Sequence, residues 1–461
     1  MTPFLETADR NVELTQQTFS QFDKPELIRK IRDAGIVGAG GAGFPTYVKM
    51  QAEAEIYLVN AAECEPMLKV DQQLMAQTPD KLIRGLLYGM LMTNAKEGVI
   101  ALKQKYQPAI DALTPLLPEN VRIHILPDVY PAGDEVITIW MATGRRVAAG
   151  ALPASVGVMV NNVQTLIQVA DALESEAPVT HRTLTINGAV AKPVTLTVPI
   201  GISLQEALDL AGGATVPNPA FISGGPMMGK LVEDLSTPVT KTTGGLLVFP
   251  DDHILVRRQK QSDQSVINMA KTVCEQCRLC TELCPRHLIG HELPPSELVK
   301  AISYENVAKP SVLMSALTCS ECGVCEAYAC PVDISPMRVN KILKKKLREQ
   351  GARYEGELRP ADPMAQYRMV PVKRLVSKLN IESYAKSAPL EPLDWHPEQI
   401  VVPVQQHIGA PSKPVVSVGD KVVLGQCIAQ PDEDALGVSI HASINGTISN
   451  ISDSAITIIR E

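Results

Sequence analysis

The chain of 461 residues is poor in aromatic side chains and carries no excess of positive charge. Phe, Trp and Tyr together make up 4%, and 43 Lys and Arg residues face 50 Asp and Glu residues, which gives a formal net charge of -7. Proteins that bind nucleic acid use basic surfaces, and those that bind single strands also use stacked aromatic rings. We therefore expect no nucleic acid among the partners.

Long apolar runs are also absent. The longest stretch without a formal charge, Val147 to Ala170, is interrupted by residues unsuited to a lipid core: Pro153, Asn161, Asn162, Gln164 and Gln168. Charged residues occur throughout the first 24 positions, where a secretory signal would have an apolar core. These features predict a cytoplasmic protein without a membrane span. Because a reducing compartment keeps thiols free, the ten cysteines then indicate metal or redox chemistry and not disulfides.

Eight of the ten cysteines lie between Cys274 and Cys330, in two sets of the same pattern. Three cysteines spaced by two residues occupy three corners of an iron-sulfur cubane, and the fourth, followed by proline, ligates the other cluster in two-cluster ferredoxins. We therefore predict two [4Fe-4S] clusters in a ferredoxin-like helical domain. The first cluster is predicted on Cys274, Cys277, Cys280 and Cys330, and the second on Cys319, Cys322, Cys325 and Cys284.

Structural zinc is the alternative for these cysteines, because CxxC pairs also form zinc sites. A zinc site needs only two such pairs and gives no reason for a third cysteine at the same spacing followed by Cys-Pro. The pattern therefore favours iron-sulfur clusters. Four residues separate Cys325 from Cys330, one more than the usual three, so the loop before Cys330 departs from the common geometry.

A glycine-rich loop, Gly38-Ala-Gly40-Gly41-Ala-Gly43, contains a formal G-x-G-x-x-G. It follows a predicted helix, Pro25–Asp33, whereas the dinucleotide fingerprint follows a strand, so a standard Rossmann assignment fails. Glycines still allow backbone amides to approach a phosphate or a flat ring closely. A plain turn is the alternative explanation.

The order of apolar runs and turns predicts a multidomain α/β protein. Strands at 56–60, 121–126 and 157–160 alternate with helices at 81–91, 134–141 and 162–173, as in a Rossmann-like domain. Paired strands at 183–186 and 194–198, a helix at 203–211 and a strand at 220–222 follow in a β-grasp-like order. A basic helix is expected at 336–350. Near the C-terminus, short strands between Gly-Asp, Gly-Gln and Asn-Gly turns predict a small all-β module. The module resembles the barrel-sandwich domains that carry biotin or lipoate on a lysine at a hairpin tip. The corresponding span here, 431–440, contains no lysine, so we do not expect a carrier function.

We expect the following organisation: an N-terminal segment, 1–24; an α/β domain that carries the glycine-rich loop, 25–178; a β-grasp domain, 179–250; the two-cluster domain, 260–350; a linker with some helix, 351–398; and the all-β module, 399–461.

Further motifs accompany the glycine-rich loop: Lys49, then Asn60-Ala-Ala-Glu-Cys-Glu65, Tyr130-Pro-Ala-Gly133-Asp-Glu135 and Asn161-Asn162-Val-Gln-Thr165. In this combination, residues 25 to 350 resemble the flavin-binding subunit of respiratory complex I and the C subunit of Rnf electron-transport complexes. The chain departs from complex I at Ala39, which replaces an arginine, and at Ala62, which replaces an aspartate.

The resemblance implies a bound FMN and NADH as electron donor, without a catalytic acid or base. Glu65 and Glu135 would lie near the nicotinamide nucleotide, and Phe44 would stack on its adenine. The implied flavin site comprises Gly38, Gly40, Gly41, Gly43, Lys49, Asn60, Tyr130, Gly133, Asn161, Asn162 and Thr165.

The position of the β module after the clusters is similar to the cobalamin reductases of bacterial propanediol utilisation. That resemblance implies NADH-dependent reduction of cob(III)alamin through cob(II)alamin toward cob(I)alamin, with an adenosyltransferase as partner and contact with a microcompartment shell. No motif marks a corrin site. By analogy alone, the loop Ile222–Gly229 of the β-grasp domain is a candidate location for the corrin, but its sequence is more typical of a structural turn. Two other functions stay open: an input subunit of a membrane-bound Rnf-type complex, and a non-enzymatic electron carrier.

Overall fold

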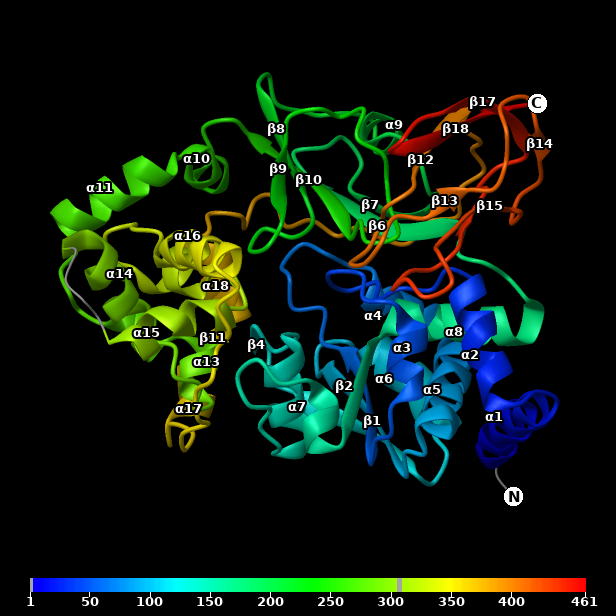
Figure 1. Cartoon of the computed structure of the whole chain (residues 1–461), viewed down its shortest axis with the longest axis horizontal. Coiled ribbons are helices and arrows are strands. Elements are labelled where there is room, and N and C mark those ends of the chain that lie inside the picture. The colour runs from blue at the N-terminus through cyan, green and yellow to red at the C-terminus, as the bar shows by residue number, and fades with distance from the viewer. Residues whose placement is uncertain (1–2, 305–308) are drawn as a thin grey trace.

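The computed structural model describes residues 3–304 and 309–461, with side chains from residue 8 onward. Figure 1 shows helices around a blue and cyan sheet, strands above it, and a separate group of green and yellow helices. Within the described residues, no helix has the length and apolar character needed to cross a membrane.

The first domain is built on a four-stranded parallel sheet in the order β3-β2-β1-β5. The order of elements confirms the Rossmann-like expectation, but the prediction passed over the central strand β2. The strands are β1 (Ile56–Ala61), β2 (Glu97–Lys103), β3 (Val121–Leu126) and β5 (Val158–Asn162). The helices are α1 (Pro3–Ser20), α2 (Lys24–Asp33), α3 (Thr46–Gln51), α4 (Asp71–Gln77), α5 (Pro79–Thr93), α6 (Gln107–Leu113), α7 (Glu135–Thr143) and α8 (Val163–Ser175).

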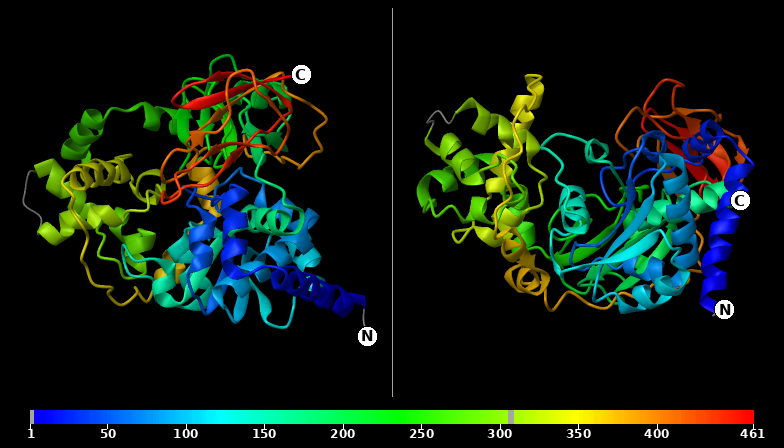
Figure 2. Two further views of the ribbon diagram at one scale, coloured as in Figure 1. Left: turned by 45° about the vertical axis from the view of Figure 1, so that its right-hand side comes forward. Right: turned by 90° about the horizontal axis from the view of Figure 1, so that it is seen from below.

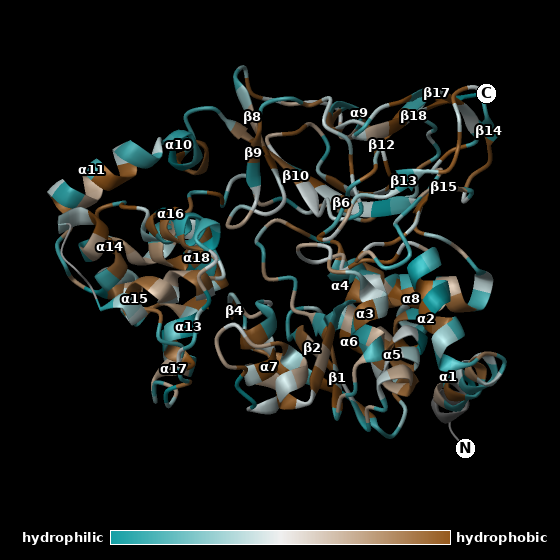
Figure 3. Cartoon of the chain, in the orientation of Figure 1, coloured by the Kyte–Doolittle hydropathy of each residue, from teal (hydrophilic) through white to brown (hydrophobic). Residues whose placement is uncertain are grey.

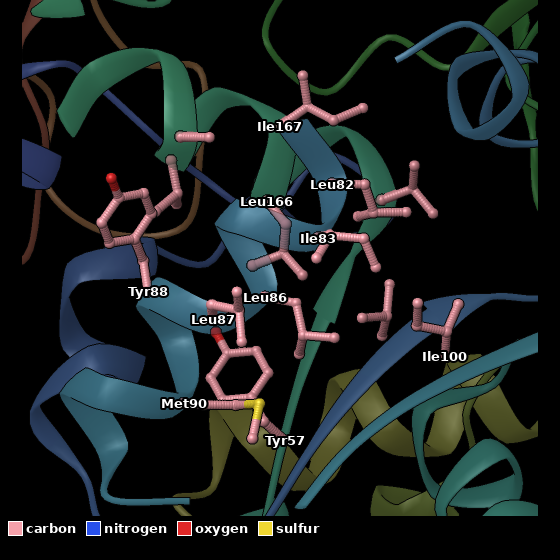
Figure 4. Packing of buried hydrophobic residues seen from close by; sticks show 14 of the residues in the cluster. Tyr57, Leu82, Ile83, Leu86, Leu87, Tyr88, Met90, Ile100, Leu166 and Ile167 are labelled. Carbon is pink, nitrogen blue, oxygen red and sulfur yellow. The ribbon is translucent and has the colours of Figure 1, made fainter. Parts of the chain in front are cut away.

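Both faces of this sheet are buried, as expected when crossover helices cover a parallel sheet. On one face, Tyr57 and Ile100 pack against apolar side chains of α5 and α8, among them Leu86 and Leu166 (Figure 4). On the other face, Leu58 and Val99 pack against α7. The strands β1 and β2 accordingly show mostly as brown in Figure 3.

Helices α5 and α8 approach closely because α5 carries glycine at the crossing. A Cβ added to Gly85 would lie 2.0 Å from the carbonyl oxygen of Leu166. A Cβ added to Gly89 would lie 2.3 Å from the ring of Tyr57. The two glycines therefore set the distance between these helices and the sheet.

The β-grasp domain has a five-stranded sheet in the order β7-β6-β10-β8-β9. Strands β6 and β7 form the predicted antiparallel pair, and β10 lies parallel to β6. Ser203 and Glu206 form a capping box that starts the helix of this domain. The elements are β6 (His181–Gly188), β7 (Val194–Pro199), α9 (Leu204–Leu210), β8 (Pro219–Ser223), β9 (Lys230–Val232) and β10 (Gly245–Pro250).

The C-terminal module consists of two small antiparallel sheets, β12-β18-β17-β14 and β13-β15-β16. Its inward side chains join those of the β-grasp domain in one hydrophobic cluster, so the green and red segments lie side by side in Figures 1 and 2. The strands are β12 (Gln399–Pro403), β13 (Lys413–Pro414), β14 (Lys421–Val422), β15 (Cys427–Gln430), β16 (Ile440–His441), β17 (Gly446–Ile451) and β18 (Ala455–Arg460).

The cysteine-rich domain is helical, with only short turns around the cysteines. Its last helix, α16, has nearly the bounds predicted from the basic stretch. The helices are α10 (Ile254–Lys260), α11 (Asp263–Val273), α12 (Leu279–Glu282), α13 (Pro285–Leu288), α14 (Pro295–Tyr304), α15 (Pro310–Met314) and α16 (Pro336–Glu349).

The segment predicted as a linker, 351–398, contributes to a core instead. Strand β11 (Val370–Pro371) pairs antiparallel with β4 (Val129–Tyr130), and α17 (Ala365–Arg368) and α18 (Val372–Lys378) flank it. Leu375, Leu379 and Ile381 are fully buried beside Phe249 and Val324. Scattered prolines and mixed charge in this segment are typical of a linker, so its apolar residues gave no recognisable pattern in the sequence. In the structure these residues cover the junction of the first domain, the β-grasp domain and the cysteine-rich domain.

Gly85→Ala is expected to destabilise the first domain by about 3 kcal/mol, because the added methyl group meets a backbone carbonyl that cannot rotate away. Chemical denaturation followed by circular dichroism measures the effect. Gly244→Ala is the control, since its Cβ would meet only a leucine methyl group at 3.8 Å. Equal stability of Gly85→Ala and the unmodified chain would contradict the close packing of α5 on α8.

Candidate functional site

The glycine-rich loop lies between α2 and α3, at the carboxyl ends of β1 and β5. Its base is fixed by three hydrogen bonds: the Gly38 amide donates to the Phe44 carbonyl (2.9 Å), the Ala39 amide to Thr165 Oγ1 (2.9 Å), and Arg182 Nη2 to the Ala39 carbonyl (2.8 Å). Its tip is exposed at Gly40 and Gly41. In the described parts of the chain, the amides of these two glycines have no hydrogen-bond partner.

Close neighbours or a positive φ require glycine at Gly40, Gly43 and Gly133, whereas a Cβ on Gly41 would meet nothing within 4 Å. A Cβ on Gly40 would lie 3.1 Å from Asn162 Nδ2, and one on Gly133 would lie 2.9 Å from Cys64 Sγ. Gly43 has a positive φ of 73° and would meet Thr242 and His407. Free amides on a backbone without side chains form a surface on which a phosphate or an isoalloxazine ring can lie, so the residues present fit an FMN.

Polar side chains from neighbouring strand ends surround this loop. Lys49 Nζ donates to the Val160 carbonyl (2.8 Å) and forms an ion pair with Glu135 (3.2 Å). Asn60 Nδ2 donates to the Gly133 carbonyl (2.9 Å), and the side chain of Asn162 caps α8 by accepting from the Gln164 amide (2.9 Å). Ligands of open parallel sheets bind at this edge, outside the carboxyl ends of the strands.

Other residues proposed for the flavin site have their side chains engaged elsewhere. Asn161 is 4% exposed, and its amide donates to the Tyr57 hydroxyl in the core (2.7 Å). Thr165 holds the Ala39 amide, and Phe44 lies half-buried at the end of the loop. The structure therefore gives Asn161 and Thr165 a supporting position behind the site.

Glu65 faces the β-grasp domain. Its carboxylate accepts from the amides of Met227 (3.0 Å) and Met228 (2.9 Å), and a Cβ on Gly225 would lie 2.2 Å from Glu65 Oε2. Burial raises the pKa of Glu65 to about 7, although the two amide hydrogen bonds favour its charged form. The carboxylate thus fixes the loop Ile222–Gly229 against the flavin domain.

The eight clustered cysteines gather around two separate cavities. Cys274, Cys277, Cys280 and Cys330 line one open cavity. Cys284, Cys319, Cys322 and Cys325 line a second cavity. Each cavity thus receives three cysteines of one set and the Cys-Pro cysteine of the other.

The cysteines surround a volume and do not converge on one point. No three His, Cys, Asp or Glu side chains in residues 3–304 and 309–461 are placed to hold a single metal ion. Burial is the main cause that raises the pKa of Cys280 to about 12, and the neighbouring thiols, of which Cys330 has the largest effect, raise it as well. Burial also raises the pKa of Cys284 to about 12. Such thiols ionise together only beside a compact positive charge, which the iron atoms of a cubane supply when bound.

One loop joins the flavin domain to the second cavity. Tyr130 is fully buried, and its hydroxyl donates to the Cys322 carbonyl (2.7 Å). Asp134 forms an ion pair with Arg286 (2.8 Å), two residues after Cys284. The carbonyl of Met227 would lie 3.2 Å from a Cβ on Gly323, so the β-grasp loop reaches the same place.

Sequence reasoning missed Asp134, Arg286, Met227 and Arg182 as members of this assembly. Asp134 stands within the Tyr130–Glu135 motif and Arg286 directly follows Cys284-Pro285, so their positions gave a signal. Met227 and Arg182 lie in other parts of the sequence, and only the fold brings them to the site.

Comparison with known proteins gives the same order of domains. Residues 31–171 match the Nuo51 FMN-binding domain, 183–231 the SLBB domain, 273–335 the 4Fe-4S dicluster domain and 377–460 the RnfC Barrel sandwich hybrid domain. These matches confirm the predicted kinds of domain.

Three curated proteins illustrate the similarity of the whole chain. It is 62% identical to cobalamin reductase PduS of Salmonella typhimurium, over 94% of this chain and 96% of that protein. It is 60% identical to cobalamin reductase PduS of Citrobacter freundii, over 95% and 97%. A component of the proton-translocating ferredoxin:NAD(+) oxidoreductase complex of Clostridium ljungdahlii is 34% identical over 59% of each chain.

The two cavities predict which cysteines share a cluster. Cys277→Ser and Cys330→Ser are expected to abolish the same EPR signal of the reduced protein, and Cys284→Ser and Cys322→Ser the other. Each substitution should lower the iron content of anaerobically reconstituted protein from about eight to about four atoms per chain.

Cys427→Ser is the matched control for these variants, because Cys427 lies in the C-terminal module and lines neither cavity. It should retain both signals. If Cys330→Ser instead lost the EPR signal that Cys284→Ser and Cys322→Ser abolish, the result would contradict the prediction that each cluster takes its fourth ligand from the other cysteine set.

Proposed function

Because the chain belongs to the family of the cobalamin reductases, we propose that it passes electrons from NADH to cobalamin through FMN and two [4Fe-4S] clusters. The reaction reduces cob(III)alamin to cob(II)alamin and onward toward cob(I)alamin. One NADH yields one NAD+, one proton and two electrons, enough for two one-electron reductions of the corrinoid. The observation that carries the proposal is the direct contact between the flavin domain and one of the two cysteine-lined cavities.

The cofactors supply the redox chemistry: a flavin accepts an electron pair as hydride and releases single electrons, which iron-sulfur clusters accept one at a time. The chain supplies position and charge. The Gly40 and Gly41 amides and the Lys49 ammonium group offer donors to an anionic cofactor at the sheet edge. We assign contact with the flavin to Gly38, Gly40, Gly41, Gly43, Lys49, Asn60, Gly133 and Asn162.

The two cavities differ in their surroundings. The Cys284 cavity adjoins Tyr130 and Asp134 of the flavin domain, and Cys284, Cys319 and Cys325 are buried. Cys277 of the other cavity is exposed, and Val273 and Leu279 beside it are 38% and 41% exposed. The acceptor therefore meets the protein most readily at the Cys277 side.

Family membership also supports a place for the chain in a bacterial microcompartment, beside an adenosyltransferase that consumes cob(I)alamin. An input subunit of an Rnf-type complex is the second candidate, favoured by the similarity to the Clostridium protein. In that type of subunit the β module precedes the flavin domain, whereas here it follows the cysteines, which favours the cobalamin reductase.

Anaerobic titration of the reconstituted protein with NADH, in the presence of hydroxocobalamin, tests the proposal. Flavin, cluster and corrin spectra should change in turn, with NADH consumed in proportion to cob(II)alamin formed. Ferredoxin as acceptor in place of cobalamin distinguishes the Rnf-type function. Turnover with ferredoxin alone would overturn the cobalamin assignment, and turnover with neither would leave an electron carrier.

Cys277→Ser is expected to leave flavin reduction by NADH at its normal rate and to slow cobalamin reduction by roughly tenfold or more, because only the exposed cysteine set is altered. Stopped-flow absorbance separates the two half-reactions. Cys427→Ser serves as control and should slow neither half-reaction. An equal loss of flavin reduction in Cys277→Ser would show that the exposed cavity is not the exit side.

A further inference from the structure

Arg182 of β6 is a buried cation whose hydrogen bonds are incomplete. Arg182 is 4% exposed. Its Nε donates to the Thr243 carbonyl (2.7 Å), and its Nη2 donates to the Ala39 carbonyl (2.8 Å). Nη1 is buried without a hydrogen-bond partner. A buried charge without full compensation is costly, so this arrangement requires an explanation.

Acidic side chains compensate the charge of Arg182 only in part. Within the described residues, Arg182 takes part in no ion pair. Asp71 is the acid near enough to influence it, but burial and then the charge of Glu63 raise the pKa of Asp71 to about 7. Burial lowers the pKa of Arg182 to about 10, so the guanidinium remains charged at neutral pH.

Arg182 is joined directly to the base of the glycine-rich loop. Thr165 of the flavin domain holds the Ala39 amide, and Arg182 of the β-grasp domain holds the Ala39 carbonyl. The next two residues, Gly40 and Gly41, present the exposed amides without partners. The loop tip is therefore positioned by two domains at once, and a cation lies beside it.

We propose that Arg182 supplies, from the β-grasp domain, the positive charge for a phosphate group that binds at the Gly40–Gly41 tip. The inference rests on the proposed flavin and NADH function and adds to it the residue that recognises the anion. The phosphate belongs either to FMN or to the dinucleotide, since both carry the same chemistry. Guanidinium and backbone amides are the donors that bind phosphate most strongly in proteins.

Equilibrium binding to the full-length chain freed of flavin tests the proposal. FMN and riboflavin, which differ only in the phosphate, are titrated and followed by quenching of flavin fluorescence. Arg182→Met is expected to weaken FMN binding by roughly 10- to 100-fold and to leave riboflavin binding unchanged. Arg182→Lys, which retains the charge without the planar fork, should give an intermediate loss of FMN affinity.

A second titration, of NAD+ into FMN-loaded protein, distinguishes the source of the phosphate. If the dinucleotide provides it, Arg182→Met retains its preference for FMN over riboflavin and instead binds NAD+ roughly 10- to 100-fold more weakly. Either loss supports the proposal. Equal weakening of FMN and riboflavin, or no change in any of the three ligands, would overturn it.

Arg258→Met is the matched control. Arg258 is a partly buried arginine whose Nη1 is likewise buried without a hydrogen-bond partner, but its Nη2 pairs with Asp333 in the cysteine-rich domain (2.8 Å). The Arg258→Met variant should have the same ratio of FMN affinity to riboflavin affinity as the unmodified chain. Circular dichroism verifies that each variant is folded. If Arg182→Met does not fold, Arg182→Lys gives the decision: an unchanged affinity for both phosphates would overturn the proposal.

The experiment separates this inference from the proposed function. An unmodified chain that binds neither flavin would contradict the flavin function itself. A chain that binds FMN normally, with Arg182 variants indifferent to the phosphate, would contradict only the role of Arg182.

Discussion

The partly buried ion pair between Asp134 and Arg286 is the contact on which the arrangement of the cofactor sites depends. Asp134 follows Gly133, whose carbonyl is bound by Asn60 at the sheet edge, and Arg286 follows a cysteine of the second cavity. Removing either partner would leave a desolvated charge, so the two domains are held in a single relative position. The Tyr130 hydroxyl on the Cys322 carbonyl adds a second tie beside it. Electron transfer depends on distance, and these contacts fix that distance.

The β-grasp domain is the second determinant of the site, although it carries none of the predicted cofactor residues. Arg182 holds the glycine-rich loop, and Glu65 binds the Met227 and Met228 amides of the loop that reaches Gly323. Lys241, 3% exposed, donates to the carbonyls of Gly35 and Ser439 and so ties the flavin domain to the C-terminal module. The chain therefore behaves as one connected body, in which the central domain positions its neighbours.

Local patterns were sufficient wherever a structure depends on neighbours in sequence. The strand Val121–Leu126 and the helix at 336–349 were predicted within a residue, because their apolar periodicity and flanking prolines are local. The strand Glu97–Lys103 was missed because it begins with Glu-Gly and gives no alternation, being buried almost throughout by helices on both sides. The composition of 351–398 predicts a linker with some helix, because its few apolar residues find partners only in the fold, where they pack beside Phe249 and Val324. Asn161 was assigned to the flavin by its motif, but strand alternation turns it to the Tyr57 side.

By itself, the sequence determined the chemistry: the spacing of eight cysteines, the run of glycines and the order of domains are properties of the chain that no packing is needed to see. The tertiary structure decided how these parts are connected. It directed Glu65 to the β-grasp loop, placed Tyr130 against the Cys322 carbonyl, and brought Arg182 to a glycine loop more than a hundred residues away. The reason is physical: ligand type and backbone freedom are encoded residue by residue, whereas the pairing of buried charges and the sharing of cavities arise only when distant segments exclude water together.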